Sequence, residues 1–265
     1  MSYATIKPMN VDTHFHIFDK NLIGEANSRY SVDYSASIGD WVALANDQGI
    51  TGGVIVQPSF LGVDNSFLLG AIKQDPKHLR GIAVVNPKST RKELLELSKQ
   101  GVRGVRLNLS GDNDPFATLQ RNQELISHLK NLGMHLQLHH DDGLLNSLLL
   151  AIPQGITLVI DHFGKPKSDS EFEKANDGIN KHRDNLWVKL SAQYRTPSIN
   201  HAVIFDYWMR IIGPTKLLWG SDWPHTRFEG SENYELQMAR FMSLTDNPEL
   251  RRQILSNNPR TLYWS

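Results

Sequence analysis

Short apolar runs alternate with longer amphipathic stretches along the whole chain. The apolar runs are rich in Val, Ile and Leu, which is typical of parallel strands that are buried on both faces. Eight such runs are predicted as strands: 9–16, 53–57, 81–85, 104–109, 134–138, 157–161, 186–190 and 216–220. Between them the apolar residues follow helical spacing, for example at 38–48, 66–74, 90–99, 116–132 and 201–212. The tail is predicted as a closing helix that stops near Asn257-Asn258-Pro259.

Eight strand–helix units in a chain of 265 residues predict a (β/α)8 barrel that spans residues 1–265 as one domain. An open, doubly wound sheet is the alternative. That fold normally has a Gly-rich phosphate-binding turn after a strand, and the sequence contains none. No linker, low-complexity segment or repeat divides the chain.

The charge and composition exclude several classes of partner. Lys and Arg number 28 and Asp and Glu number 28, so no global field would attract nucleic acid or an anionic membrane. No apolar run approaches the ~20 residues of a membrane helix, and the first ten residues lack the apolar core of a secretory signal. The absence of cysteine excludes disulfides and thiolate ligands and fits a reducing compartment. We therefore expect a cytoplasmic protein, with its oligomeric state undetermined.

Polar residues collect where the predicted strands end. In a (β/α)8 barrel, catalytic groups lie at the C-terminal ends of the strands, so this distribution indicates an active site. The residues concerned are His14, His16, Gln57, Ser59, Asn86, Arg106, Asn108, Gln137, His139, His140, Asp161, His162, Lys189, Ser191, Arg195, Asp222 and His225.

The first predicted strand ends in "NVDTHFHIFD", residues 10–19. Because alternate side chains of a strand share a face, Asp12, His14 and His16 are expected to point the same way. Two neighbouring imidazoles can bind a metal ion, a carbonyl oxygen or an oxyanion, and they are an unusual choice for packing alone.

Three segments, "VDTHFH", "IDHFGKP" and "LLWGSDWPH", resemble signatures of the amidohydrolase superfamily, in the amidohydrolase 2 branch. "GVRLNL" and "VKLSAQYR" resemble the subgroup of 2-pyrone-4,6-dicarboxylate lactonases, and the likeness covers nearly the whole chain in order. The resemblance implies a (β/α)8 barrel that hydrolyses a C–O or C–N bond. It assigns the general base to Asp222 and the other catalytic positions to His14, His16 and His162.

The resemblance also bears on metal. Binuclear members of the superfamily have a bridging lysine on the fourth strand, whereas this chain has "RLNLS" there, and His139 is late in register. A single Zn or Mn ion held by His14, His16, His162 and Asp222 is the alternative, since imidazoles and a carboxylate suit either metal. The dicarboxylate lactonases are described as working without metal, so we expect no cofactor, with the histidines holding the lactone carbonyl.

The expected substrate is a small anionic lactone. Arg106 and Arg195 are candidate carboxylate-binding residues, because a guanidinium matches a carboxylate in shape and charge. Ser59 and Tyr30 match substrate-contact positions of the lactonases. These lactonases have a second arginine shortly after the one on the fourth strand, where this chain has the acidic "SGDNDP". A dicarboxylate, a monocarboxylate and a sugar-derived lactone therefore all stay open, with Arg29 or Lys165 as further cations.

The sequence thus predicts a lactone hydrolase in which Asp222 activates water and histidines stabilise the oxyanion. A covalent acyl-enzyme is disfavoured because the chain has no cysteine and no G-x-S-x-G motif. The alternatives are a metal-dependent amidohydrolase or decarboxylase, a lactone isomerase, and a non-catalytic binding barrel.

Overall fold

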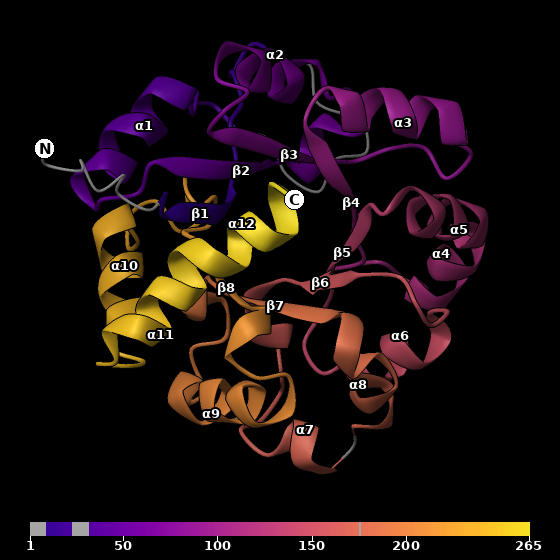
Figure 1. The fold of residues 1–265 in the computed structure, drawn as a ribbon, viewed down its shortest axis with the longest axis vertical. Coiled ribbons are helices and arrows are strands. Elements are labelled where there is room, and N and C mark those ends of the chain that lie inside the picture. Colours follow the sequence, from indigo (N-terminus) through magenta and orange to yellow (C-terminus); the bar gives the residue numbers. More distant parts are fainter. Residues whose placement is uncertain (1–8, 23–31, 175) are drawn as a thin grey trace, which may run out of the picture.

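A computed structural model describes residues 9–22, 32–174 and 176–265 of the chain. Eight parallel strands form one sheet in the order β1 to β8. The backbone beyond β8 returns to β1: His16 N donates to Trp223 O and Asp222 N donates to His14 O, both at 2.8 Å. These bonds bring the ends of the sheet together, with helices outside the strands (Figure 1). The predicted (β/α)8 barrel is confirmed, and an open doubly wound sheet is excluded.

Each of the eight strands begins and ends within two residues of its predicted bounds. The strands are β1 Val11–Phe15, β2 Gly52–Val56, β3 Leu79–Ala83, β4 Val102–Asn108, β5 His135–His139, β6 Leu158–Ile160, β7 Leu186–Leu190 and β8 Leu217–Trp219. The helices are α1 Ile38–Asp47, α2 Ser66–Gln74, α3 Arg91–Lys99, α4 Pro115–Arg121, α5 Gln123–Leu132, α6 Leu145–Ala151, α7 Glu171–Lys174, α8 Asp177–His182, α9 His201–Ile211, α10 Tyr234–Met242, α11 Pro248–Arg252 and α12 Asn258–Tyr263.

Local sequence sets several helix starts. Ser37 and Asp40 form a capping box at α1, and Thr90 and Glu93 form another at α3. In each, the hydroxyl accepts a backbone N–H of the first turn while the acid accepts the backbone N–H of the capping residue. Among the described residues no helix is both long and apolar enough to cross a bilayer.

Two helix predictions need correction. The stretch 116–132 is two helices that divide at Asn122, whose side-chain amide donates to Thr118 O at 2.8 Å. The closing helix does not stop at Asn257-Asn258-Pro259, because it passes through one π turn into α12. Pro259 directly follows the π turn, where the regular i to i−4 hydrogen bonding is already interrupted because Asn258 N donates to Gln253 O.

The apolar core has two layers. Inside the barrel, Val11, Val54, Ile82, Val159 and Leu218 pack together with Tyr263. Tyr263 belongs to α12, which crosses the barrel at the end where the strands begin (Figure 1). A larger cluster fills the space between the strands and the surrounding helices. The end of the barrel where the strands begin is therefore closed by α12. The polar residues lie at the opposite end, where the strands finish.

A bulge in β1 changes the expected direction of Asp12. The register between β1 and β2 shifts between Asp12 and Phe15. The Asp12 carboxylate accepts hydrogen bonds from Trp41 Nε1 (3.1 Å) and Tyr234 OH (3.1 Å), so it faces helices α1 and α10. His14 instead lies against Asp161 inside the barrel. The prediction that Asp12 shares a face with the two histidines is wrong, because the extra residue of a bulge reverses the alternation.

Candidate active site

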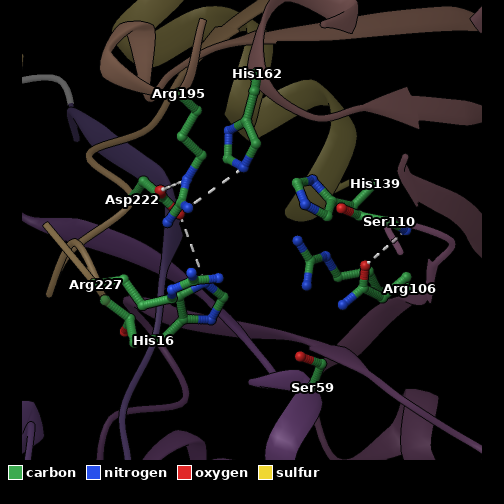
Figure 2. A pocket seen from close by; sticks show the side chains of 11 residues that line it. His16, Ser59, Arg106, Ser110, His139, His162, Arg195, Asp222 and Arg227 are labelled. Carbon is green, nitrogen blue, oxygen red and sulfur yellow. Dashed lines mark hydrogen bonds and ion pairs between the residues drawn. The ribbon is translucent and has the colours of Figure 1, made fainter. Parts of the chain in front are cut away.

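A pocket opens at the end of the barrel where the strands finish (Figure 2). Its lining residues are His16, Ser59, Arg106, Asn108, Ser110, His139, His162, Arg195, Asp222, Thr226 and Arg227. Six of the sequence-predicted site residues are in this set, and His14 lies fully buried beside them. Tyr30 lies outside the described residues, as does Arg29. Lys165 pairs with Asp142 (3.1 Å) and does not line the pocket.

Asp222 is held from both sides. Its backbone has a left-handed φ of 60°, and its amide is fixed by His14 O. Oδ2 accepts hydrogen bonds from Tyr194 OH (2.6 Å) and Arg195 Nε (2.8 Å). Oδ1 faces the Nε2 atoms of His14 (3.5 Å), His16 (3.6 Å) and His162 (4.0 Å). One carboxylate oxygen is thus anchored, and the other faces a group of three imidazoles.

The electrostatic surroundings keep Asp222 ionised. Burial by itself raises the pKa of this carboxyl, but the Arg195 guanidinium beside it holds the pKa well below its usual range. Burial lowers the pKa of His14 to about 3 and that of His162 well below its usual value. At neutral pH the site therefore contains one carboxylate facing neutral His14 and His162 rings.

The Nδ1 partner of each histidine limits what its Nε2 can do. His16 Nδ1 lies 2.7 Å from Val56 O, and a carbonyl only accepts, so Nδ1 carries the proton. His162 Nδ1 lies 2.9 Å from Ser191 Oγ, which can donate or accept. His14 Nδ1 lies between Asp161 Oδ1 (3.2 Å), an acceptor, and Lys189 Nζ (3.4 Å), a donor. His14 and His162 can therefore present an Nε2–H when neutral, whereas His16 presents one only when doubly protonated.

Asp161, Arg106 and Lys189 form a buried ion-pair network inside the barrel, next to His14. Asp161 Oδ2 accepts from Arg106 Nε at 3.0 Å, and its Oδ1 lies 3.9 Å from Lys189 Nζ. Lys189 is fully buried, donates to Thr13 O (2.7 Å) and Gln137 Oε1 (2.8 Å), and burial lowers its pKa to about 7. Arg106 is thus paired with the buried Asp161 while it lines the pocket.

The comparisons with known proteins agree with this geometry. The sequence profile described as amidohydrolase matches residues 11–264. The chain belongs to the amidohydrolase family. This amidohydrolase is 28% identical to a 2-pyrone-4,6-dicarboxylate hydrolase of Comamonas testosteroni, covering 96% of this chain and 90% of the relative. It is 29% identical to a 4-sulfomuconolactone hydrolase of Rhizobium radiobacter, covering 95% and 89%.

A solved structure is similar along nearly its whole length. It is an Acinetobacter baumannii protein, described as a candidate 2-pyrone-4,6-dicarboxylic acid hydrolase, crystallised with citric acid. The TM-score is 0.85 and the identity 33%, over 97% of this amidohydrolase and 99% of that chain. The resemblance read from the sequence is confirmed at the level of the family.

The residues of this amidohydrolase fit a single metal ion. Ligand atoms of His14, His16 and Asp222 all lie within 4.8 Å of one another, and His162 belongs to a second such group with His14 and Asp161. Each histidine Nδ1 has its own partner, as ligating histidines in proteins usually do. The separations of 3.5 to 4.0 Å from Oδ1 are close to the roughly 3.4 Å between neighbouring ligands of a tetrahedral zinc site with bonds of about 2.1 Å. Strand β4 offers no lysine to bridge a second ion.

Sequence reasoning missed three polar residues around Asp222. Tyr194 donates to Asp222 Oδ2, and Thr226 and Arg227 line the pocket from the loop after β8. Tyr194 directly precedes the predicted Arg195, and Arg227 follows Asp222 by five residues, so proximity in sequence was the available signal. His182 lies away from this site and is buried, with Nε2 at 3.0 Å from Leu149 O.

Proposed function

We propose that this amidohydrolase opens a small, carboxylate-bearing lactone by general-base hydrolysis, and that it does so without metal. The observation that carries the proposal is the asymmetric Asp222 carboxylate. One oxygen is anchored by Tyr194 and Arg195, and the other is directed at three imidazoles in a pocket lined by arginine. The names of the full-length relatives, which act on a pyrone dicarboxylate and a sulfomuconolactone, support this substrate class.

Hydrolysis begins with a water molecule beside Asp222 Oδ1. The carboxylate accepts a proton as the water oxygen attacks the lactone carbonyl carbon. Negative charge then develops on the carbonyl oxygen, where Nε2–H groups of His14 and His162 donate hydrogen bonds. One such donor typically contributes about 3 kcal/mol to the barrier. The bond from the acyl carbon to the ring oxygen breaks, and the proton held by Asp222 passes to that oxygen.

His16 has a different role from the other two histidines. Its Nδ1 proton is committed to Val56 O, so a neutral ring presents a bare Nε2 to the pocket. A bare nitrogen accepts a hydrogen bond and can orient the attacking water, whereas it cannot donate to a carbonyl. We assign water positioning to His16 and carbonyl polarisation to His14 and His162.

The arginines bind the acidic substituent of the lactone. Arg106 is oriented by Asp161, which holds Nε at 3.0 Å. Arg195 is oriented by Asp222 and lies over the Tyr194 ring at 5.1 Å. Two pre-oriented guanidiniums lose little side-chain entropy when a carboxylate binds. Ser59 lies in the same pocket and is assigned to substrate contact.

If a single Zn or Mn ion were bound, His14, His16, His162 and Asp222 would hold it. Such an ion would polarise the carbonyl and lower the pKa of a bound water. The roles assigned above to Arg106, Arg195 and Ser59 do not depend on this ion.

A panel of lactones tests the proposal. It contains 2-pyrone-4,6-dicarboxylate, 4-sulfomuconolactone, a monocarboxylate lactone and a sugar-derived lactone, each followed by proton release in a pH-stat and by NMR of the product. We expect ring-opened acid and one proton released per turnover for at least one acidic member. An isomerised lactone, released CO₂, or ligand binding without turnover would instead support an isomerase, a decarboxylase or a binding barrel.

A further inference from the structure

Three guanidiniums line the pocket, and two of them are ion-paired with buried carboxylates. Arg106 pairs with Asp161 at 3.0 Å, and Arg195 pairs with Asp222 at 2.8 Å. Within the described part of the chain, no carboxylate oxygen lies within 4.0 Å of the Arg227 guanidinium. Arg106 and Arg195 are thus each paired with a buried carboxylate, and among the described residues Arg227 is the pocket guanidinium without such a partner.

Figure 2 shows where this charge lies. Arg227 extends into the pocket on the side of His16 and Asp222, whereas Arg106 lies with Ser110 and His139 on the other side. A ligand that spans the pocket would therefore have a guanidinium at each end. Asp222, the proposed general base, lies on the Arg227 side of the pocket (Figure 2).

The loop that carries Arg227 is held in a defined shape. His225 N donates to Asp222 O (2.9 Å), and Phe228 N donates to His225 O (2.7 Å). The Phe228 ring packs against Tyr194 with 4.8 Å between the ring centres. These contacts fix the backbone on both sides of Arg227, so the guanidinium approaches the pocket from a defined point.

The backbone at Arg227 is itself unusual. Its φ is 75°, in the left-handed region that favours glycine. The strained backbone lowers the stability of the fold, and the exposed Arg227 side chain does not offset this by burying apolar surface. Backbone strain of this kind is concentrated at functional sites, where the side chain is needed in one place.

We propose that Arg227 binds an anionic substituent on the Asp222 side of the substrate, so that the enzyme prefers lactones with two anionic groups over those with one. This inference rests on the proposed function, because it specifies the substrate of the same site. Arg106 binds the anion at the far side, and Arg227 binds the one next to the reacting ester.

Binding of benzene-1,3-dicarboxylate and of benzoate, measured by isothermal titration calorimetry, tests Arg227 independently of catalysis. Losing one charge-assisted contact at a partly solvated site lowers affinity by about tenfold. Arg227→Met should therefore weaken dicarboxylate binding about tenfold and leave benzoate binding unchanged. Arg227→Lys should recover part of the loss, because it keeps the charge but not the planar fork.

Two further variants separate charge recognition from structure. Arg91→Met removes an exposed arginine outside the pocket, changes the net charge equally, and should leave both affinities unchanged. Arg227→Gly should weaken dicarboxylate binding like Arg227→Met while keeping or raising the urea midpoint of unfolding, since glycine adopts a left-handed φ freely.

Equal losses for dicarboxylate and benzoate in Arg227→Met, or no loss for either, would overturn the assignment. So would a wild-type enzyme that binds both probes equally well. If the lactone panel shows no hydrolysis while the dicarboxylate pattern holds, the proposed function fails and Arg227 stands as an anion-binding residue.

Discussion

Replacing Tyr194 with phenylalanine tests how a single hydrogen bond sets the pKa of the proposed general base, Asp222. The hydroxyl donates to Asp222 Oδ2 at 2.6 Å, and the ring packs against Phe228 and under the Arg195 guanidinium. Phenylalanine keeps these ring contacts and removes only the donor. The buried Asp222 carboxylate then loses one of the two hydrogen bonds on its anchored oxygen.

The size and direction of the change in the Asp222 pKa follow from the negative charge of the carboxylate that accepts the Tyr194 hydrogen bond. A hydrogen bond to a charged group contributes roughly 1.5–3 kcal/mol, which corresponds to about 1–2 pKa units. Because the donor stabilises the ionised form, its loss raises the pKa of Asp222 from its depressed position. Only the carboxylate accepts the proton of water, so activity should begin to fall at a higher pH than in the wild type.

The assay is the pH dependence of kcat/KM for the lactone identified in the panel, at constant ionic strength. Tyr194→Phe should move the acidic limb of the profile upward by about 1–2 units. Above that limb it should retain substantial activity, because Asp222 becomes the stronger base. Tyr207→Phe, which removes a hydroxyl outside the pocket, is the matched control and should leave the profile in place. An acidic limb that stays put or moves downward in Tyr194→Phe would refute the reasoning.

Three further predictions concern the substrate, the stability of the fold and the metal. Arg106→Met and Arg195→Met should each raise KM for an acidic lactone by about 10- to 100-fold and leave KM for its methyl ester unchanged. In Arg195→Met, kcat should fall for both substrates because Asp222 loses an anchoring partner. Equal changes in KM for acid and ester would contradict carboxylate binding. Arg106→Met should also lower the free energy of unfolding by about 3 kcal/mol in urea titrations, because Asp161 stays buried without its strongest partner. Enzyme purified without chelator should contain well under one metal per chain and keep its activity in chelator, while His14→Ala and His162→Ala should each raise the barrier by about 2–4 kcal/mol. Stoichiometric metal, with activity that follows its removal and return, would assign His14, His16, His162 and Asp222 to an ion.

The barrel and the convergence of its histidines could be predicted from the sequence because both follow from regular geometry. Parallel strands buried on both faces leave continuous apolar runs, and their C-terminal ends meet at one end of the barrel. Residues far apart in the chain, such as His14, His162 and Asp222, are brought together by that rule alone.

The features that escaped prediction depend on irregular backbone. The bulge in β1 redirected Asp12, and the loop after β8 uses left-handed conformations at Asp222 and Arg227 that no periodicity encodes. The hydrogen bond from Tyr194 to Asp222 joins two such loops. The pairing of Arg106 with Asp161 was missed for another reason, since several acids were available in the sequence and only the register of β4 against β5 and β6 selects one.

The central claim is that Asp222 activates water to open a lactone, and Asp222→Asn tests it most directly. Asparagine can still accept from Tyr194 and Arg195 through its carbonyl oxygen, so the variant should fold and bind, but it cannot take a proton from water. We expect kcat on the identified lactone to fall by about 100- to 10,000-fold, with the affinity for benzene-1,3-dicarboxylate little changed. Turnover close to that of the wild type in Asp222→Asn would contradict the account.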